Sequence, residues 1–118
     1  MKAIESFKDL QVWQRSIQLS VALYRLTQTF PIEERYGLTS QLRRAGVSVA
    51  SNIAEGYGRG STGEYKHFLG IARGSNAEVQ TQLVIARELG FGDPQRILTA
   101  DGLSQEIARM LVSLMQKL

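Results

Sequence analysis

Apolar residues recur at intervals of three and four along four segments of the chain, which is the spacing of one face of a helix. Pro31, Pro94 and the stretch Gly58-Arg-Gly-Ser61 separate these segments, and proline and glycine commonly interrupt helices. No segment shows the alternation or the β-branched content of a strand. Because short connections between long helices imply antiparallel neighbours, we expect an all-α fold, an antiparallel up-down four-helix bundle.

Capping residues place the ends of these helices. Ser6 and Asp9 are spaced as a capping pair, and Ser61-Thr-Gly-Glu64 has the pattern of a capping box. Gly90 is a natural C-terminal stop, and Asp93-Pro94 supplies an N-cap and a first-turn proline. The four expected helices cover residues 8–29, 33–57, 61–89 and 94–117.

The start of the second helix is ambiguous. Gly37 is able to end a short first turn, whereas Thr39 or Ser40 is able to cap the main body of the helix. Glu33 and Glu34 suit the positive end of the helix dipole. As neighbours on a helix they point apart, so we assign them to the helix start and not to acid–base catalysis.

The first helix has two apolar faces. One stripe consists of Val12, Leu19, Leu23, Leu26 and Phe30, and the other, nearly opposite, of Leu10, Trp13, Ile17, Val21 and Tyr24. A helix in an isolated bundle needs only one apolar face, so the second face predicts contact with another molecule. We expect self-association, with Trp13, Ile17 and Tyr24 in the oligomer interface. The alternative is a broad core face with a few exposed apolar residues.

The composition bounds the class of protein. With 118 residues, 43% of them hydrophobic and 21% charged, the chain suits one globular domain over residues 1–118. No apolar run approaches the roughly 20 residues that cross a bilayer, and the N-terminal segment lacks the apolar core of a signal peptide. The absence of cysteine excludes a disulfide framework and a thiolate zinc site. We expect a cytoplasmic protein without a membrane partner.

Residue types that catalysis requires are scarce. His67 is the only histidine, so one subunit lacks the parts of a histidine-rich metal site or a Ser-His-Asp triad. The segment Gly56-Tyr-Gly-Arg-Gly60 does not follow a strand, as phosphate-binding loops do, and is better suited to ending a helix. We therefore predict that the protein is not an enzyme and has no catalytic residue, metal or cofactor.

The second helix carries polar residues where a buried surface is expected. Arg44, Ser48, Ser51 and Glu55 recur at four, three and four residues, so they share one face among small neighbours. Buried charges demand partners, which favours an architectural role over ligand recognition. The expected structural polar network consists of Arg44, Ser48, Asn52, Glu55 and Glu78.

An antiparallel hairpin of the second and third helices supplies partners for this network. The hairpin places Arg44 near the level of Ser75 and Glu78, and Asn52 near the level of His67 and Phe68. Our hypothesis is that Glu78 accepts hydrogen bonds from Arg44 or Arg43, in the same subunit or in the next.

Two glycines, Gly70 and Gly74, lie inside the expected third helix. Each lowers helix stability by roughly 1 kcal/mol relative to Ala. Such a loss usually has a structural reason, and we expect another helix to approach closely at these positions.

The net charge of +3 is mildly basic, and ten of the fourteen basic residues are arginine. A basic patch that forms when several subunits come together suits nucleic acid, whereas ordinary surface charge is the alternative. The candidate nucleic-acid contacts, which include an aromatic residue able to stack on a base, are Arg43, Arg44, Tyr57, Arg59, Lys66 and Arg73.

Longer motifs stand in a characteristic order along the chain. They are Phe7-Lys-Asp-Leu-Gln-Val-Trp13, Phe30-Pro-Ile-Glu-Glu-Arg-Tyr-Gly-Leu38, Gln41-Leu-Arg-Arg-Ala45, Ser51-Asn-Ile-Ala-Glu-Gly56, Gly58-Arg59, Phe68-Leu-Gly-Ile-Ala-Arg-Gly-Ser75 with Glu78, and Ala86-Arg-Glu-Leu-Gly90. With these motifs the chain resembles the four-helix bundle proteins called 23S rRNA-intervening sequence proteins, or S23. The resemblance extends through the last helix by pattern only.

The resemblance implies an antiparallel four-helix bundle that assembles into a homopentamer. It also implies similarity to the accessory variability proteins of diversity-generating retroelements, which are basic pentamers that associate with a reverse transcriptase and nucleic acid. Five subunits at +3 each carry about +15, a usable electrostatic surface. We expect a non-enzymatic, self-assembling scaffold whose partner is RNA, DNA or a nucleic-acid enzyme. The alternative is a structural or protein-interaction oligomer without a nucleic-acid role.

Overall fold

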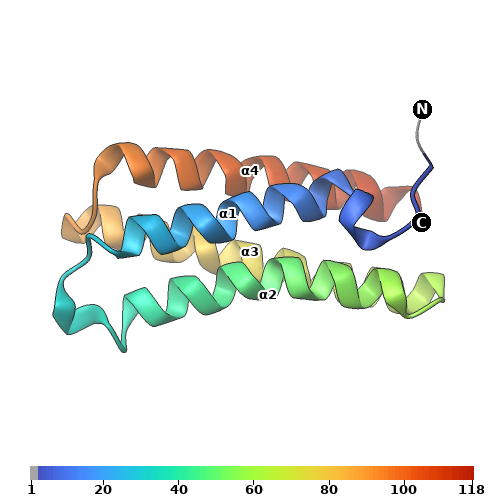
Figure 1. Ribbon diagram of the computed structural model, residues 1–118, viewed down its shortest axis with the longest axis horizontal. Helices are drawn as coiled ribbons and strands as arrows, with labels where there is room; N and C mark the ends of the chain where they lie inside the picture. Colours follow the sequence, from blue (N-terminus) through green and yellow to red (C-terminus); the bar gives the residue numbers. More distant parts are fainter. Residues whose placement is uncertain (1–2) are drawn as a thin grey trace.

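The computed structural model describes residues 3–118, which fold into four long helices (Figure 1). These helices are α1 (Gln11–Thr27), α2 (Leu38–Gly58), α3 (Thr62–Leu89) and α4 (Pro94–Gln116), and short 3-10 helices η1 (Phe7–Asp9) and η2 (Ile32–Glu34) precede α1 and α2. Successive helices run in alternating directions, and α1 and α3 each pack against both α2 and α4. The expected all-α, antiparallel up-down bundle is confirmed, and the described residues contain no strand.

Of the predicted capping residues, Ser61 begins α3, whereas Ser6 and Asp9 cap the 3-10 helix η1 and not α1, which begins at Gln11 without a side-chain cap. Ser6 Oγ accepts a hydrogen bond from the backbone N–H of Lys8 at 3.2 Å, and Asp9 Oδ2 accepts from the backbone N–H of Ser6 at 3.3 Å. Ser61 Oγ accepts from the backbone N–H of Glu64 at 3.2 Å and begins α3. These bonds satisfy N–H groups that have no partner inside the helix.

The start of α2 differs from both predicted caps. Neither Thr39 nor Ser40 caps the helix, which begins at Leu38 with Gly37 as its N-cap residue. Instead, Glu34 Oε1 accepts a hydrogen bond from the backbone N–H of Leu38 at 3.1 Å. The Glu34 carboxylate thereby satisfies a free N–H at the positive end of the helix, the position that favours a negative charge.

One hydrophobic core lies between the four helices. The predicted inward stripe of the first helix is buried throughout and consists of Val12, Leu19, Leu23 and Leu26 on α1 and Phe30 just beyond its end. The other helices contribute Leu42, Val49 and Ile53 from α2, Leu69, Val79 and Leu83 from α3, and Ile97, Ile107 and Leu111 from α4. Full burial of one such side chain contributes about 1.5–3 kcal/mol. None of the helices described is both long and apolar enough to cross a membrane.

A buried polar pair ties α3 to α4 inside this core. Asn76 Nδ2 donates to the backbone carbonyl of Ser104 at 2.9 Å, and Ser104 Oγ donates to Asn76 Oδ1 at 2.8 Å. Asn76 is 1% exposed and Ser104 is fully buried. Because each residue donates to the other, the pair satisfies its own buried polar groups and fixes the register of the two helices.

Close helix contact occurs at glycines other than the predicted ones. A Cβ atom added at Gly56 would lie 2.8 Å from Phe68 Cβ, and one added at Gly46 would lie 2.7 Å from Leu23 Cδ1. Gly70 and Gly74 lie on the exposed side of α3, and no neighbouring atom of the described chain lies within 4 Å of their Cβ positions. The prediction of a close helix at Gly70 and Gly74 is therefore wrong within a single chain.

Candidate functional site: the polar face of the α2–α3 hairpin

A groove of about 410 Å³ runs between the outward sides of α2 and α3. The α2/α3 groove is lined by Gln41, Arg44, Ala45 and Ser48 from α2 and by Ser75, Glu78 and Gln82 from α3. Sequence reasoning placed Arg44, Ser48 and Glu78 here but missed the two glutamines. Gln41 is three residues from Arg44 and Gln82 is four from Glu78, so the same helix periodicity contains the missing signal.

The middle of the predicted polar network is formed within the chain. Ser48 Oγ and Ser75 Oγ are 2.8 Å apart and share a hydrogen bond across the two helices. Asn52 Nδ2 donates to Ser48 Oγ at 3.0 Å and to the backbone carbonyl of Ser48 at 2.8 Å. The small side chain of Ala45, which lines the groove beside Ser48 and Ser75, leaves room for the two helices to approach. The bonds therefore support α2–α3 packing.

The charged members of the network do not join it within the chain. Arg44 and Glu78 are both exposed, and neither has an ion-pair or hydrogen-bond partner among residues 3–118. The hypothesis that Glu78 accepts from Arg43 or Arg44 in the same subunit is therefore wrong. Both side chains nevertheless line the α2/α3 groove, so Arg44 lies near Glu78 as predicted, whereas Ser75 lies at the level of Ser48 and not of Arg44.

The predicted level of Asn52 is wrong by about one helical turn. Gly56, not Asn52, lies against Phe68. The reversal of the chain comes later than expected, because α2 continues to Gly58 and Arg59 keeps helical backbone angles of φ −76° and ψ −22°. Gly60 then makes the turn, and its φ of +82° is a backbone conformation that residues with a side chain rarely adopt.

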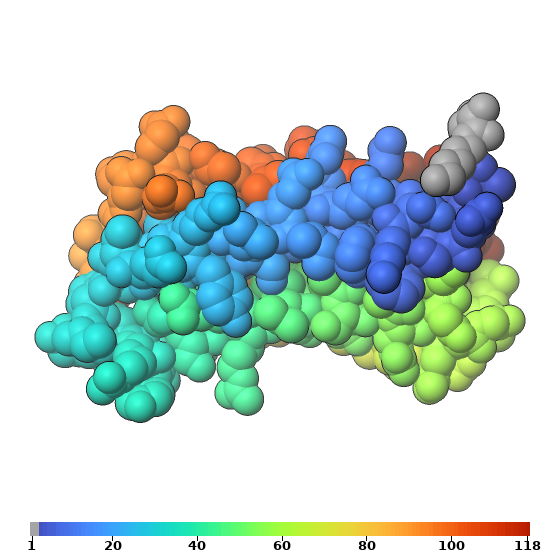
Figure 2. Space-filling model, in the orientation of Figure 1, coloured from blue at the N-terminus to red at the C-terminus, as the bar shows by residue number. Residues whose placement is uncertain are grey.

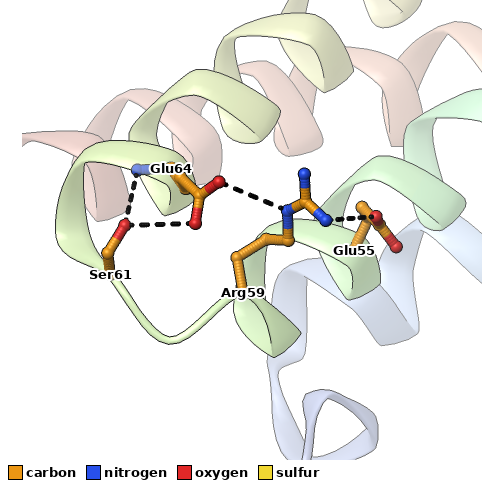
Figure 3. A network of polar contacts seen from close by, with 4 residues as sticks. All are labelled: Glu55, Arg59, Ser61 and Glu64. Atoms are coloured by element: carbon orange, nitrogen blue, oxygen red, sulfur yellow. Dashed lines mark hydrogen bonds and ion pairs between the residues drawn. The ribbon is translucent and has the colours of Figure 1, made fainter.

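The α2–α3 turn holds Arg59 between two carboxylates (Figure 3). Arg59 Nη1 lies 3.5 Å from Glu55 Oε1, and Arg59 Nε lies 3.6 Å from Glu64 Oε1. The guanidinium also stacks over the Phe68 ring at 5.0 Å from its centre. Two carboxylates around one guanidinium leave a local charge of about −1, which opposes the approach of a phosphate.

Tyr57, another candidate contact, packs against Tyr65 beside this turn. The two rings meet edge to face with their centres 6.0 Å apart. Burial, and to a lesser degree the neighbouring Tyr57, raises the pKa of Tyr65 above its ordinary value near 10. Tyr65 is therefore a neutral hydroxyl at physiological pH, and the Tyr57–Tyr65 pair serves chiefly to pack the end of the hairpin.

Arg43, another candidate nucleic-acid contact, is directed toward α1. Its Nε donates to Thr27 Oγ1 at 2.8 Å, and its guanidinium lies 4.5 Å from the centre of the Tyr24 ring. The positive charge thus sits at the C-terminal end of α1, where the helix dipole favours a cation. Arg43 links α2 to α1 within the chain.

The remaining basic candidates, Lys66 and Arg73, are exposed on α3. No ion-pair partner for either lies in the part of the chain that the structure describes. They are seven residues apart and so lie on one side of the helix, about 10.5 Å apart along its axis. Together with Arg44, these are the candidate contacts whose charge is not compensated.

Comparison with known proteins places this arrangement in a family. A family model described as 23S rRNA-intervening sequence protein matches residues 8–113. The chain belongs to the 23S rRNA-intervening sequence protein family. The fold of this family member is also similar to a crystal structure from Bacteroides thetaiotaomicron VPI-5482, a protein with unknown function from the S23 ribosomal protein family. The two chains are 21% identical, with a TM-score of 0.77 over 88% of this chain and 97% of the other. Comparison with curated proteins gives no match.

A second candidate surface of this 23S rRNA-intervening sequence protein lies on α1, which is at the front of Figure 2 between α4 and α2. Ile17, Val21 and Tyr24 are 38%, 42% and 44% exposed, and we call these three residues the α1 face. Trp13, the other predicted interface residue, is half-buried, packs against the core, and contacts the Phe7 ring edge to face at 5.2 Å. The predicted second apolar stripe of α1 is thus largely open to solvent.

The only histidine of this 23S rRNA-intervening sequence protein, His67, lies on the exposed side of α3. Its ring meets the Phe68 ring edge to face at 5.3 Å, in agreement with the predicted packing or surface role. Within residues 3–118, no three His, Asp or Glu side chains come together as a set of metal ligands.

Proposed function

We propose that the protein is a cytoplasmic, self-assembling helical scaffold that associates with RNA, DNA or a nucleic-acid enzyme and has no catalytic activity of its own. The observation that carries self-assembly is the α1 face, where Ile17, Val21 and Tyr24 lie exposed on one stripe of a helix whose opposite stripe fills the core. Grouped apolar side chains of this kind mark interaction surfaces. The α1 face supports self-association, and the number of five subunits rests on the family resemblance.

A ring of five requires each α1 face to contact a different surface on the next chain, because an odd ring cannot be built from two-fold contacts alone. The outward side of α3 suits this role. α1 and α3 do not pack against each other and so lie diagonally across the bundle. Gly70 and Gly74 leave open space on α3, and Val84, further along the same helix, is 45% exposed. The apolar ridge on α1 therefore has a bare surface on α3 to meet, and Lys66 and Arg73, four and three residues from Gly70, lie at the edge of that contact.

We expect Val21→Glu to lower the native mass of the assembly fivefold, because a carboxylate in an apolar contact loses its water without gaining a partner. The native mass, measured by light scattering, would fall from a multiple of five chains of 13.1 kDa each. The matched control is Val112→Glu, at a valine that is 36% exposed on α4. Equal dissociation by both variants, or a wild-type mass that is no multiple of five chains, would contradict the proposed ring.

Association with nucleic acid is supported by the net charge of +3 and by the uncompensated Lys66 and Arg73. We expect fluorescence anisotropy with single-stranded RNA and DNA to show affinity that falls steeply with salt, as bound counterions are released. Lys66→Gln with Arg73→Gln should reduce the slope of log affinity against log salt by about 0.7 for each phosphate that the variant no longer neutralises. The control with the same charge change is Arg96→Gln with Arg109→Gln on α4, and an equal effect of the two pairs would argue against a defined α3 contact.

A protein-interaction oligomer without a nucleic-acid role is the second candidate. Two of the predicted nucleic-acid contacts favour it, because Arg43 is held by Thr27 and Tyr24 and Arg59 by Glu55 and Glu64. The same titration separates the two functions. If the protein assembles fully but binds neither nucleic acid in a salt-dependent way, the result supports the protein-interaction oligomer and rules out the nucleic-acid role.

A further inference from the structure

A cavity of about 470 Å³ lies between the start of α1 and the end of α4, and we call it the α1/α4 cavity. Both helix ends are at the right of Figure 1, where the two helices lie side by side. Its volume is in the range of small-molecule binding sites. Neither the α1 face nor the outward side of α3 contributes a lining residue, so the proposed ring leaves the cavity accessible.

The floor of the α1/α4 cavity is apolar. Leu10 and Val12 contribute to it from α1, and Met110 and Leu114 from α4. Val12 is buried in the core, and the other three side chains are half-buried and pack against the core. Apolar surface that water covers is stabilised when an apolar group replaces the water. A hydrocarbon chain laid along this floor would therefore bind favourably.

The rim of the cavity is positively charged. Arg109, Ser113 and Lys117 follow one another at intervals of four residues, so they lie on one side of α4 over about 12 Å. Neither Arg109 nor Lys117 has an ion-pair partner among residues 3–118, and no Asp or Glu lines the cavity. The positive end of the α1 dipole lies at the same place. The rim therefore favours an anion.

We propose that the α1/α4 cavity binds a free long-chain carboxylic acid, whose hydrocarbon chain covers the apolar floor and whose carboxylate is held by Arg109 and Lys117. Both side chains bind carboxylates through charge-assisted hydrogen bonds. The hydroxyl of Ser113, which stands between them on α4, is a further donor. Each chain of the scaffold would thus carry its own ligand, on a surface that the ring contacts do not use.

Nucleic acid and a lipid bilayer fit the α1/α4 cavity less well than a free acid does. A nucleic acid supplies phosphates for the rim but has no hydrocarbon chain for the floor. A bilayer presents a broad surface, whereas the floor lies between two helices and accommodates a single chain. The combination of an apolar floor with a cationic rim is matched in one molecule by a carboxylate with a long tail.

Isothermal titration calorimetry with dodecanoate, below its micelle concentration, tests the proposal. We expect one dodecanoate to bind for each chain, and Arg109→Gln with Lys117→Gln to weaken this binding at least about tenfold, because both charged donors are lost. The control with the same charge change is Arg25→Gln with Arg96→Gln, at the opposite end of the bundle, which should leave the affinity unchanged. All four side chains are exposed, so both variants should fold.

Ligands that share one half of dodecanoate separate the roles of floor and rim. Hexanoate should bind more weakly, since each methylene buried on the floor raises the affinity by up to about fourfold. Dodecyltrimethylammonium, which has the same tail and the opposite charge, should not bind. Equal binding of this cation and dodecanoate, or an equal effect of the two pairs of substitutions, would overturn the proposal.

NMR of labelled methionine methyl groups locates the bound acid. Met110 lines the cavity, whereas Met115 packs against the core without lining it. Dodecanoate should therefore shift the Met110 signal and leave the Met115 signal in place, and an unshifted Met110 would overturn the proposal. Displacement of dodecanoate by single-stranded RNA or DNA would overturn it too and assign the cavity to nucleic acid.

The cavity and the ring are tested separately. Val21 does not line the cavity, so Val21→Glu chains that no longer assemble should still bind dodecanoate with unchanged affinity. An intact ring that does not bind dodecanoate would disprove the cavity site and leave the scaffold in place. Sedimentation with anionic phospholipid vesicles that Arg109→Gln with Lys117→Gln abolishes would assign the cavity to a bilayer and contradict a free acid.

Discussion

Asn76→Asp is expected to lower the free energy of unfolding by about 3–5 kcal/mol at pH 7, the usual effect of a buried charge without a partner. Asn76 is 1% exposed, and its Nδ2 donates to the backbone carbonyl of Ser104 at 2.9 Å. In the variant a carboxylate oxygen would face that carbonyl oxygen, so two acceptors would meet without a hydrogen between them. Only the protonated acid is able to donate across this contact.

The loss caused by Asn76→Asp should depend on pH. Burial raises the pKa of the introduced carboxyl above the value near 3.9 that it has in the unfolded chain. Stability is therefore retained below about pH 4 and lost as the pH rises through the raised pKa. Urea denaturation at pH 4 and pH 7, each relative to wild type, measures the difference. Asn76→Leu is the uncharged control and should lower stability by about 1–3 kcal/mol at both values. Equal stability of Asn76→Asp and wild type at pH 7 would disprove the buried pair.

Gly56→Ala and Gly102→Ala are expected to change stability in opposite directions. At Gly56 the added Cβ would lie 2.8 Å from Phe68 Cβ and 3.2 Å from the Tyr65 carbonyl oxygen, so α2 and α3 must move apart. Overpacking of this kind lowers stability by about 1–3 kcal/mol. Gly102 lies within α4 with no neighbouring atom of the described chain within 4 Å. There the variant should raise stability by about 0.5–1 kcal/mol, because Ala favours the helix.

Urea denaturation of the two alanine variants under identical conditions provides the measurement. Both substitutions add one methyl group to a helical glycine, so intrinsic helix propensity is largely matched between them. A stabilising Gly56→Ala would show that α2 and α3 are able to separate at that point without loss. A destabilising Gly102→Ala would show that another surface approaches α4 closely.

The parts of the fold that sequence predicted well depend on short-range signals. Three residues stop or start a helix through their own local chemistry, namely Ser61, Gly90 and Pro94. Both ends of α3 and the start of α4 therefore lie at the predicted positions. The inward stripe of α1 was predicted because burial follows helix periodicity. Its outward stripe was recognised for the same reason, since Ile17 and Tyr24 recur at that period.

The incorrect parts depend on how helices face each other. Asn76 and Ser104 are 28 residues apart, and nothing in either helix alone indicates that their side chains meet. Arg43 was assigned to nucleic acid or to Glu78, but the rotation of α2 directs it to Tyr24 instead. The level of Asn52 was misjudged by a turn because α2 continues to Gly58. Position along one helix is readable from spacing, whereas rotation between two helices is set by core packing.

The bare outward side of α3 also bears on how the bundle unfolds. Gly70 and Gly74 remove side chains from the middle of this helix and weaken its intrinsic propensity, while the nearby Leu69 and Ala72 are fully buried. The centre of α3 is thus helical because of its contacts with α2 and α4 and not because of its own sequence. A segment of this kind does not persist as residual helix once its neighbours leave, and it therefore couples the melting of the hairpin to the loss of the whole core.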